Sequence, residues 1–252
     1  MTTLPELSTR WDMAAGCRVF SRFCEMGDRE RLPVVLVHGL SMSSRYMIPT
    51  ARRLARDFRV YAPDLPGYGE SPRPPAVLQI KELAEVLAGY MDALGLGPAY
   101  LLANSMGCQI VAALAQQQPE RVRKAVLIGP SMDPRTRSLH GLFYRAVMNM
   151  VFEPAAFYPV LARDYFAAGV RETFTGMRYS MEDLLEQRAP EVRCPALVLR
   201  GSHDWLVTQP WVERLAALLA QGRVEVIPRG AHVANFDAPD QVAERVRKFL
   251  IA

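Results

Sequence analysis

Six short apolar runs recur along the chain, and they constrain its fold more than any other feature of the sequence. Each is rich in Val, Leu or Ile and ends at Gly, Pro, Asn or Asp. The runs are PVVLVHG (33–39), RVYAPDLPG (59–67), AYLLAN (99–104), KAVLIGP (124–130), PALVLRG (195–201) and RVEVIPRG (223–230). Their hydrophobicity is continuous rather than alternating, which indicates strands covered on both faces, as in a parallel sheet.

Helical patterns separate these runs. Apolar residues spaced three and four positions apart lie between 83 and 94 and again between 242 and 250, which predicts a helix in each range. Near the start of the second of these helices, Asp237 and Asp240 are expected to cap the helix and to place negative charge in its first turn. The first thirty residues alternate more and predict antiparallel edge strands. We therefore expect an α/β fold with a mostly parallel, doubly wound sheet and helices on both of its faces.

The segment 131–190 interrupts this alternation because it carries no strand pattern. It is too apolar for a loop and too irregular for a single core helix. We interpret it as a helical insertion that lies over the carboxyl edge of the sheet. The predicted domains are therefore a core formed by residues 1–130 and 191–252 and a helical lid formed by residues 131–190.

Composition narrows the range of functions. The chain has 252 residues, half of them hydrophobic, and its net charge of +4 comes mainly from scattered arginines. The absence of a basic stripe interleaved with aromatic residues disfavours a nucleic-acid partner. No apolar run reaches the length of a membrane span, the N-terminus has no apolar signal core, and the four cysteines lack metal-site spacing. We expect a cytoplasmic protein that acts on a small molecule without a metal or other cofactor.

Polar residues that follow the predicted strands mark a candidate site, since open parallel sheets carry their sites beyond the carboxyl ends of the strands. Ser105, Asp204 and His232 each follow one of the apolar runs. A serine needs a base to become a nucleophile, and His232 is placed to be that base. Asp204 is the predicted acid that stabilises the imidazolium, and Asp133, which follows the preceding strand, is the alternative acid.

Several motifs of the chain together resemble the α/β-hydrolase superfamily, in its serine esterase or carbon–carbon hydrolase-like branch. The motifs are LVHGL (36–40), DLPGYGESPRP (64–74), ANSMGC (103–108), LRGSHDWLV (199–207) and GAHVANFDAPDQV (230–242). Their order places the serine, the acid and the histidine in the sequence typical of that family.

The stretch ANSMGC resembles the nucleophile elbow of that family. Ala103 replaces the first glycine of the usual G-x-S-x-G pattern, a change that the looser small-x-nucleophile-x-small pattern accepts. The alternative is that Ser105 only caps the helix that follows it. An elbow would place the backbone N–H groups of Met106 and Leu40 as an oxyanion hole, with His38 organising the loop that carries Leu40.

The resemblance and the apolar insertion predict the substrate class. Tyr46, Phe143, Met148 and Phe236 are expected to line an apolar pocket above the serine. The predicted activity is cleavage of a carboxylic ester or thioester of a mainly apolar small molecule through an acyl-enzyme. The alternatives are a carbon–carbon bond hydrolase of the meta-cleavage type, an acyltransferase, and a binding protein with this fold.

The carbon–carbon hydrolases usually carry a tryptophan soon after the catalytic histidine and a substrate-binding arginine in the lid. The tryptophan is absent here, and Phe236 stands in that region. The candidates for the arginine are Arg145, Arg163, Arg171 and Arg178.

Overall fold

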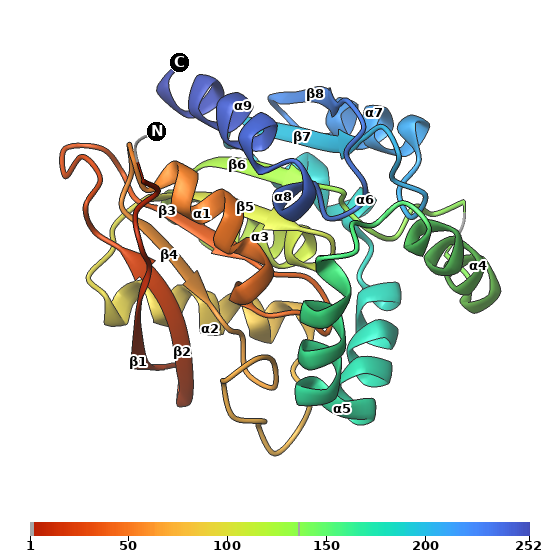
Figure 1. The fold of residues 1–252 in the computed structure, drawn as a ribbon, viewed down its shortest axis with the longest axis horizontal. Helices are drawn as coiled ribbons and strands as arrows, with labels where there is room; N and C mark the ends of the chain where they lie inside the picture. The colour runs from red at the N-terminus through yellow and green to blue at the C-terminus, as the bar shows by residue number, and fades with distance from the viewer. Residues whose placement is uncertain (1–2, 136) are drawn as a thin grey trace.

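A computed structural model describes residues 3–135 and 137–252, in which eight strands form one sheet in the order β1-β2-β4-β3-β5-β6-β7-β8 (Figure 1). The strands are β1 (Ser8–Ala14), β2 (Cys17–Cys24), β3 (Val34–Val37), β4 (Val60–Pro63), β5 (Ala99–Asn104), β6 (Val122–Ile128), β7 (Ala196–Gly201) and β8 (Gly222–Ile227). Strands β3 to β8 are parallel, whereas β1 and β2 are antiparallel at one edge. The prediction of a mostly parallel α/β sheet with antiparallel strands at the start is confirmed.

The strand order reverses between β3 and β5. The chain winds outward from β3 to β4, returns to the other side of β3 as β5, and continues outward to β8. The loops that follow β3 and β5 therefore diverge at this point, and such a switch point is where open sheets bind ligands. These loops carry His38 and Ser105, respectively.

Helices cover both faces of the sheet and enclose one hydrophobic core on each face. The helices are η1 (Ser44–Met47), α1 (Ile48–Leu54), α2 (Ile80–Ala93), α3 (Met106–Gln117), η2 (Pro119–Arg121), α4 (Leu139–Met150), α5 (Phe157–Glu182), α6 (Leu185–Arg188), η3 (Ala189–Glu191), α7 (Gln209–Leu218), α8 (Ala234–Asp237) and α9 (Pro239–Ile251). Side chains of α2, α3 and α7 belong to one core, and those of α1, α8 and α9 belong to the other.

The central strands supply both cores from alternate residues. In β3, Val35 and Val37 belong to the first core, whereas Val34 and Leu36 belong to the second. Two covered faces explain why these runs are continuously apolar. The expectation of two covered faces is wrong for β8, which has exposed side chains along its length because it is the last strand of the sheet.

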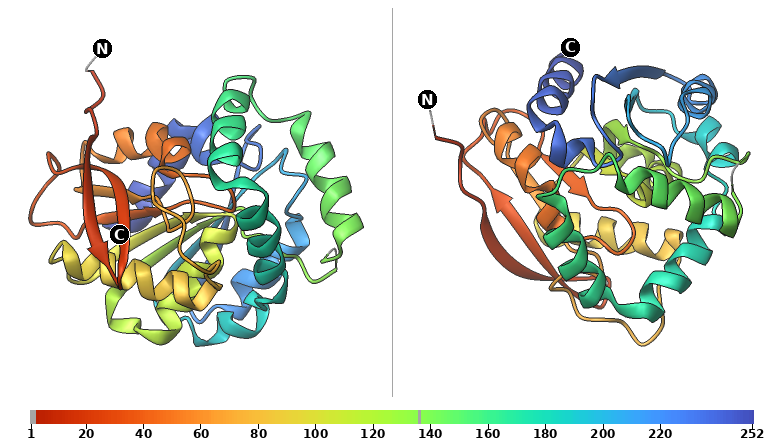
Figure 2. Two further views of the ribbon diagram at one scale, coloured as in Figure 1. Left: turned by 90° about the horizontal axis from the view of Figure 1, so that it is seen from below. Right: turned by 45° about the vertical axis from the view of Figure 1, so that its right-hand side comes forward.

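Helices α4 and α5 lie in the segment between β6 and β7, on one side of the molecule (Figures 1 and 2). Helix α5 consists of two arms, because Gly169 has a non-helical backbone with φ 78° and ψ 173°. The positive φ favours glycine at this bend, and a Cβ on Gly169 would also displace the flexible end of Arg73, whose Nη2 would lie 2.7 Å away. Two hydrogen bonds join α5 to the loop after β3, from Ser43 to Asp164 and between Ser41 and Thr173.

The end of β7 approaches the segment before His232 so closely that only glycine fits there. A Cβ on Gly201 would lie 2.2 Å from the carbonyl oxygen of Gly230 and 2.3 Å from that of Ala231. We predict that Gly201→Ala lowers the free energy of unfolding by about 2 kcal/mol, measured by urea denaturation, because backbone must move to admit the methyl group.

Gly97→Ala is the matched control, since a Cβ at Gly97 meets no atom within 4 Å. It should change the free energy of unfolding by less than about 0.5 kcal/mol. Equal losses in the two variants would show that the close approach at Gly201 does not limit stability.

Candidate active site

Ser105 occupies a strained turn between β5 and α3. Its backbone has φ 56° and ψ −126°, a conformation that costs a residue other than glycine roughly 1–3 kcal/mol. The turn is held by hydrogen bonds from Ser105 N to Ile128 O at 3.0 Å and from Cys108 N to Ser105 O at 2.9 Å. The Ser105 side chain makes no capping hydrogen bond to α3, so the interpretation of this serine as a helix cap is wrong.

The two small residues on either side of Ser105, Ala103 and Gly107, differ in how much space the fold leaves for a side chain. A Cβ on Gly107 would lie 2.7 Å from the carbonyl oxygens of both Val37 and His38, so a glycine is required there. Ala103 is fully buried and pairs with Val37 and Leu127 on the adjacent strands. The fold therefore accommodates the methyl group of Ala103, the position at which the sequence departs from the usual motif.

His232 and Asp204 form a buried hydrogen-bonded pair. The Nδ1 atom of His232 lies 2.9 Å from Oδ2 of Asp204, and the other carboxylate oxygen accepts a hydrogen bond from Val207 N at 2.9 Å. A carboxylate accepts, so Nδ1 carries the proton and Nε2 is left with a lone pair. A Cβ on Gly129, at the end of β6, would lie 3.0 Å from His232 Nδ1 and 3.1 Å from Asp204 Oδ2, so a glycine leaves room for the pair.

The surroundings of His232 raise its pKa above the ordinary value. Burial lowers the pKa, but the charge of Asp204, its hydrogen bond and the charge of Glu153 favour the imidazolium and outweigh burial. The neutral ring, which alone can accept a proton, therefore predominates only at a pH above this raised pKa.

Glu153 is a carboxylate near the pair that sequence reasoning missed. It is 9% exposed, and its Oε1 accepts a hydrogen bond from Asn149 Nδ2 at 2.6 Å. Its Oε2 has no hydrogen-bond partner within residues 3–135 and 137–252. Asn149 also accepts a hydrogen bond from the backbone N–H of Trp205, the residue after Asp204. Burial raises the pKa of Glu153 to about 7 against the opposing effects of His232 and Asn149.

A pair of buried side chains, Tyr46 and Asn104, ties the loops of the site together. The Tyr46 hydroxyl accepts a hydrogen bond from Gly39 N at 2.8 Å and donates one to Asn104 Oδ1 at 2.9 Å. Asn104 Nδ2 then donates to His232 O at 3.1 Å. Tyr46 was expected to line a substrate pocket, but it is fully buried and its hydroxyl is committed to these contacts.

Leu40 and Met106 place two backbone N–H groups near Ser105. Met106 is the first residue of α3, where the N–H groups have no partner within the helix. Leu40 follows Gly39, where a Cβ would lie 3.0 Å from the Cβ of Ser105. Neither N–H has a protein acceptor in the described part of the chain. The predicted oxyanion hole requires two such unpaired N–H groups.

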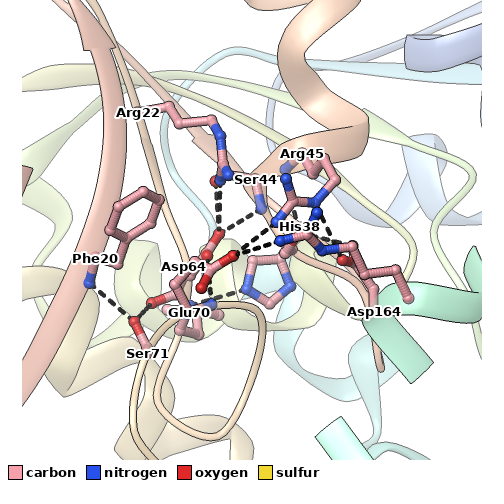
Figure 3. A network of polar contacts seen from close by, with 12 residues as sticks. Phe20, Arg22, His38, Ser44, Arg45, Asp64, Glu70, Ser71 and Asp164 are labelled. Atoms are coloured by element: carbon pink, nitrogen blue, oxygen red, sulfur yellow. Dashed lines mark hydrogen bonds and ion pairs between the residues drawn. The ribbon is translucent and has the colours of Figure 1, made fainter. Parts of the chain in front are cut away.

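A buried polar network supports the loop that carries Leu40 (Figure 3). Asp64 is fully buried and accepts hydrogen bonds from Ser44 N at 2.6 Å, Ser44 Oγ at 2.5 Å and Glu70 N at 2.9 Å. Arg22 Nη1 lies 3.6 Å from the same carboxylate. Asp64, the acid of the DLPGYGES motif, therefore holds the surrounding loops together through these contacts, and they account for its presence in the motif.

His38 belongs to the same network. Its Nε2 accepts a hydrogen bond from Leu65 N at 2.9 Å, so its Nδ1 carries the proton and donates to Gly39 O at 2.8 Å. Burial lowers the pKa of His38, so the ring stays neutral. His38 thereby links the loop after β4 to the turn before Leu40, consistent with the organising role predicted for it.

The other residues that were expected to line a substrate pocket differ in their packing and exposure. Phe236 packs against Phe157, with ring centroids 5.6 Å apart, and Phe157 in turn lies 6.3 Å from the ring of Tyr46. Met148 is partly buried on α4. Phe143 is 73% exposed on the same helix, so the structure does not bring it to the site.

The other acids considered from the sequence make hydrogen bonds to other groups. Asp133 accepts hydrogen bonds from Thr208 Oγ1 at 2.7 Å and Arg135 N at 3.0 Å, whereas His232 is paired with Asp204. The expectation that Asp237 caps the last helix is wrong, because Asp237 lies in α8 and accepts from Ala231 N at 2.8 Å. This hydrogen bond holds Ala231, the residue before His232, against α8. Asp240, as expected, lies in the first turn of α9.

Comparisons with known proteins agree with this geometry. The model of the alpha/beta hydrolase family matches residues 34–245. Carboxylesterase YbfK of Bacillus subtilis is 25% identical over 89% of this chain and 82% of its own. The 2-hydroxy-6-oxo-2,4-heptadienoate hydrolase of Pseudomonas putida is 29% identical over 87% of this chain and 89% of its own. A solved thermophilic esterase from Thermogutta terrifontis, 24% identical, superimposes with a TM-score of 0.80 over 96% of this chain and 98% of that one.

The charge of Glu153 generates a prediction about His232. We predict that Glu153→Gln lowers the pKa of His232, because it removes a negative charge that favours the imidazolium. NMR titration of the ring resonances measures this pKa without reference to any activity. Glu182→Gln is the control, since Glu182 is an exposed acid at the end of α5 and should leave the pKa unchanged. An unchanged or higher pKa in Glu153→Gln would contradict the electrostatic account.

Proposed function

This chain belongs to the α/β hydrolase family, and from that premise we propose that it cleaves a carboxylic ester or thioester of a mainly apolar small molecule through an acyl-enzyme. The chain is an α/β-fold hydrolase, and its similarity to carboxylesterases supports the choice of bond. The observation that carries the proposal is the buried His232–Asp204 hydrogen bond of 2.9 Å, anchored through Asn104 beside the strained Ser105.

In the proposed reaction, Ser105 Oγ attacks the acyl carbon while His232 Nε2 takes its proton. Asp204 stabilises the imidazolium that results. The N–H groups of Leu40 and Met106 bind the oxyanion of the tetrahedral intermediate. His232 then returns the proton to the leaving alcohol or thiol, and a water molecule activated by the same ring releases the acid.

The contacts of the arginines on α4 and α5 support an apolar substrate. Each candidate arginine has a partner within the protein, and none of these partners is Ser105, Asp204 or His232. Arg145 donates to Trp205 O at 3.0 Å, Arg163 pairs with Glu70 at 3.2 Å, Arg171 donates to Pro75 O at 2.8 Å, and Arg178 lies 3.9 Å from the Glu182 carboxylate. An isolated substrate carboxylate would therefore lack a counter-charge from these residues, and its burial would be costly.

In this proposal residues 131–190 act as a lid on the core formed by residues 1–130 and 191–252, and the substrate binds beneath them. Contacts of α5 with Ser41 and Ser43, next to Leu40, support this role. Carbon–carbon hydrolysis is the second candidate, because the 2-hydroxy-6-oxo-2,4-heptadienoate hydrolase is as similar to this chain as the esterases are.

Separate substitutions of two acids test the assignment of Asp204. We predict that Asp204→Asn lowers kcat by roughly 10³- to 10⁴-fold, because the ring loses the carboxylate that fixes its tautomer. Asp133→Asn should cause a far smaller loss, since Asp133 bonds to Thr208 and the Arg135 backbone. Steady-state ester hydrolysis measures both, with Ser105→Ala as the inactive reference. A larger loss in Asp133→Asn would transfer the role to that residue.

A series of esters tests the substrate class. We predict that kcat/KM for p-nitrophenyl esters rises from acetate toward octanoate, because each added methylene buries apolar surface. A monoester of a dicarboxylic acid should be poorer than the neutral ester of equal length. Preference for the charged ester, or faster turnover of a meta-cleavage dienone than of any ester, would favour carbon–carbon hydrolysis instead.

A further inference from the structure

Helix α5 has 26 residues, and polar residues lie on the buried side of its second arm. No helix within residues 3–135 and 137–252, α5 included, is both long and apolar enough to cross a membrane. Glu172 of the second arm is 1% exposed, and neither of its carboxylate oxygens has a hydrogen-bond partner in the same ranges. Buried polar groups are normally hydrogen-bonded, and a buried charge without a counter-charge is very costly. The position of Glu172 therefore requires a partner that the described residues do not supply.

The arginines beside this arm bind backbone oxygens instead. Arg73, which lies against the bend of α5, donates from Nη2 to Ala167 O at 2.7 Å. Arg171, the residue before Glu172, donates to Pro75 O at 2.8 Å. Neither arginine hydrogen-bonds to the Glu172 carboxylate.

Tyr68 and Leu40 lie against the same face of the arm as Glu172. Gly176 is four residues after Glu172, so the two residues share one side of the helix. A Cβ on Gly176 would lie 2.8 Å from the hydroxyl oxygen of Tyr68 and 2.8 Å from Cδ1 of Leu40. A Cβ on Gly67, the residue before Tyr68, would lie 3.1 Å from Cγ of Glu172. Burial and then the charge of Glu172 raise the pKa of Tyr68, so the hydroxyl stays protonated near the carboxylate.

Glu172 is close in the structure to the loop that carries the predicted oxyanion donor. Leu40 is expected to direct its N–H toward an oxyanion at Ser105. Ser41, the residue after Leu40, shares a hydrogen bond of 2.8 Å with Thr173, the residue after Glu172. A group bound at Glu172 can therefore belong to the same small molecule as an acyl carbon at Ser105.

We propose that Glu172 and Tyr68 bind a protonated amine carried by the substrate. An ammonium group has a positive charge and three hydrogen-bond donors, so it can satisfy both oxygens of Glu172 and donate to the Tyr68 hydroxyl. A neutral hydroxyl would leave the carboxylate without a counter-charge. Because the oxygens of Glu172 are buried, the second arm opens at the non-helical Gly169 to admit the amine and closes on it. This inference rests on the proposed function, since the amine is part of the ester.

The test is isothermal titration calorimetry of Ser105→Ala, which measures binding without turnover. The probes are hexylammonium and, as a neutral molecule of similar length, 1-hexanol. Hexylammonium should bind the more tightly of the two. Adding Glu172→Gln should weaken hexylammonium binding roughly 10- to 100-fold, because hydrogen bonds to a charged group are lost, and should leave hexanol binding unchanged. Tyr68→Phe should cause a smaller loss, since the carboxylate remains.

Glu182→Gln is the matched control, because Glu182 is an exposed acid on the same helix. In the Ser105→Ala background it should leave hexylammonium binding unchanged. Thermal unfolding without a probe is the second measurement. Glu172→Gln should unfold at a temperature no lower than Ser105→Ala alone, since it removes a buried charge that has no partner. Hexylammonium should raise the unfolding temperature of Ser105→Ala more than that of the double variant.

Equal binding of hexylammonium and hexanol would overturn the proposal, as would an equal loss of binding in Glu182→Gln. A lower unfolding temperature in Glu172→Gln would also contradict it, because the carboxylate would then stabilise the fold without a ligand. Failure of the proposed function looks different. Hydrolysis of neutral p-nitrophenyl esters by the wild type without hexylammonium binding contradicts this inference alone, whereas hexylammonium binding without ester hydrolysis contradicts the proposed function.

Discussion

The hydrogen bonds of Asn104 hold the parts of the site in one place. Its amide nitrogen donates to Ile128 O and His232 O, and its oxygen accepts from Tyr46, which also receives the N–H of Gly39. Asn104 directly precedes Ser105, so the turn of Ser105, the loop after β3 and the segment of His232 share one buried anchor. Loss of Asn104 would deprive the Tyr46 hydroxyl of its acceptor and His232 O of its donor, at a cost of about 1–3 kcal/mol for each buried group.

This anchor allows the site to hold features that are unfavourable in isolation. Ser105 has a strained backbone, and the pair of His232 and Asp204 is buried with the carboxylate of Glu153 near it. Burial penalises every charged form, yet opposite charges at close range compensate and favour the imidazolium. In the proposed mechanism, the raised pKa of His232 gives the ring a strong affinity for the serine proton and limits catalysis at low pH.

The strands and the positions of Ser105, Asp204 and His232 at strand ends were predictable from sequence, because they depend on local apolar runs and on a parallel sheet. Tyr46, Phe143 and Glu153 were not predicted correctly or at all. Their surroundings depend on which way a side chain points once distant segments pack, and no local pattern contains that information. Asp237 illustrates the same point, since its position near the last helix suggested a cap while its carboxylate binds Ala231 N.

The central claim is that Ser105 is the nucleophile and that His232 activates it. The most direct measurement is peptide mass spectrometry after treatment with a serine-directed fluorophosphonate, across a range of pH. The account predicts one adduct, on Ser105, whose rate of formation falls as His232 becomes protonated. Ester hydrolysis that continues with Ser105 unmodified, or an adduct on another residue with loss of activity, would contradict it.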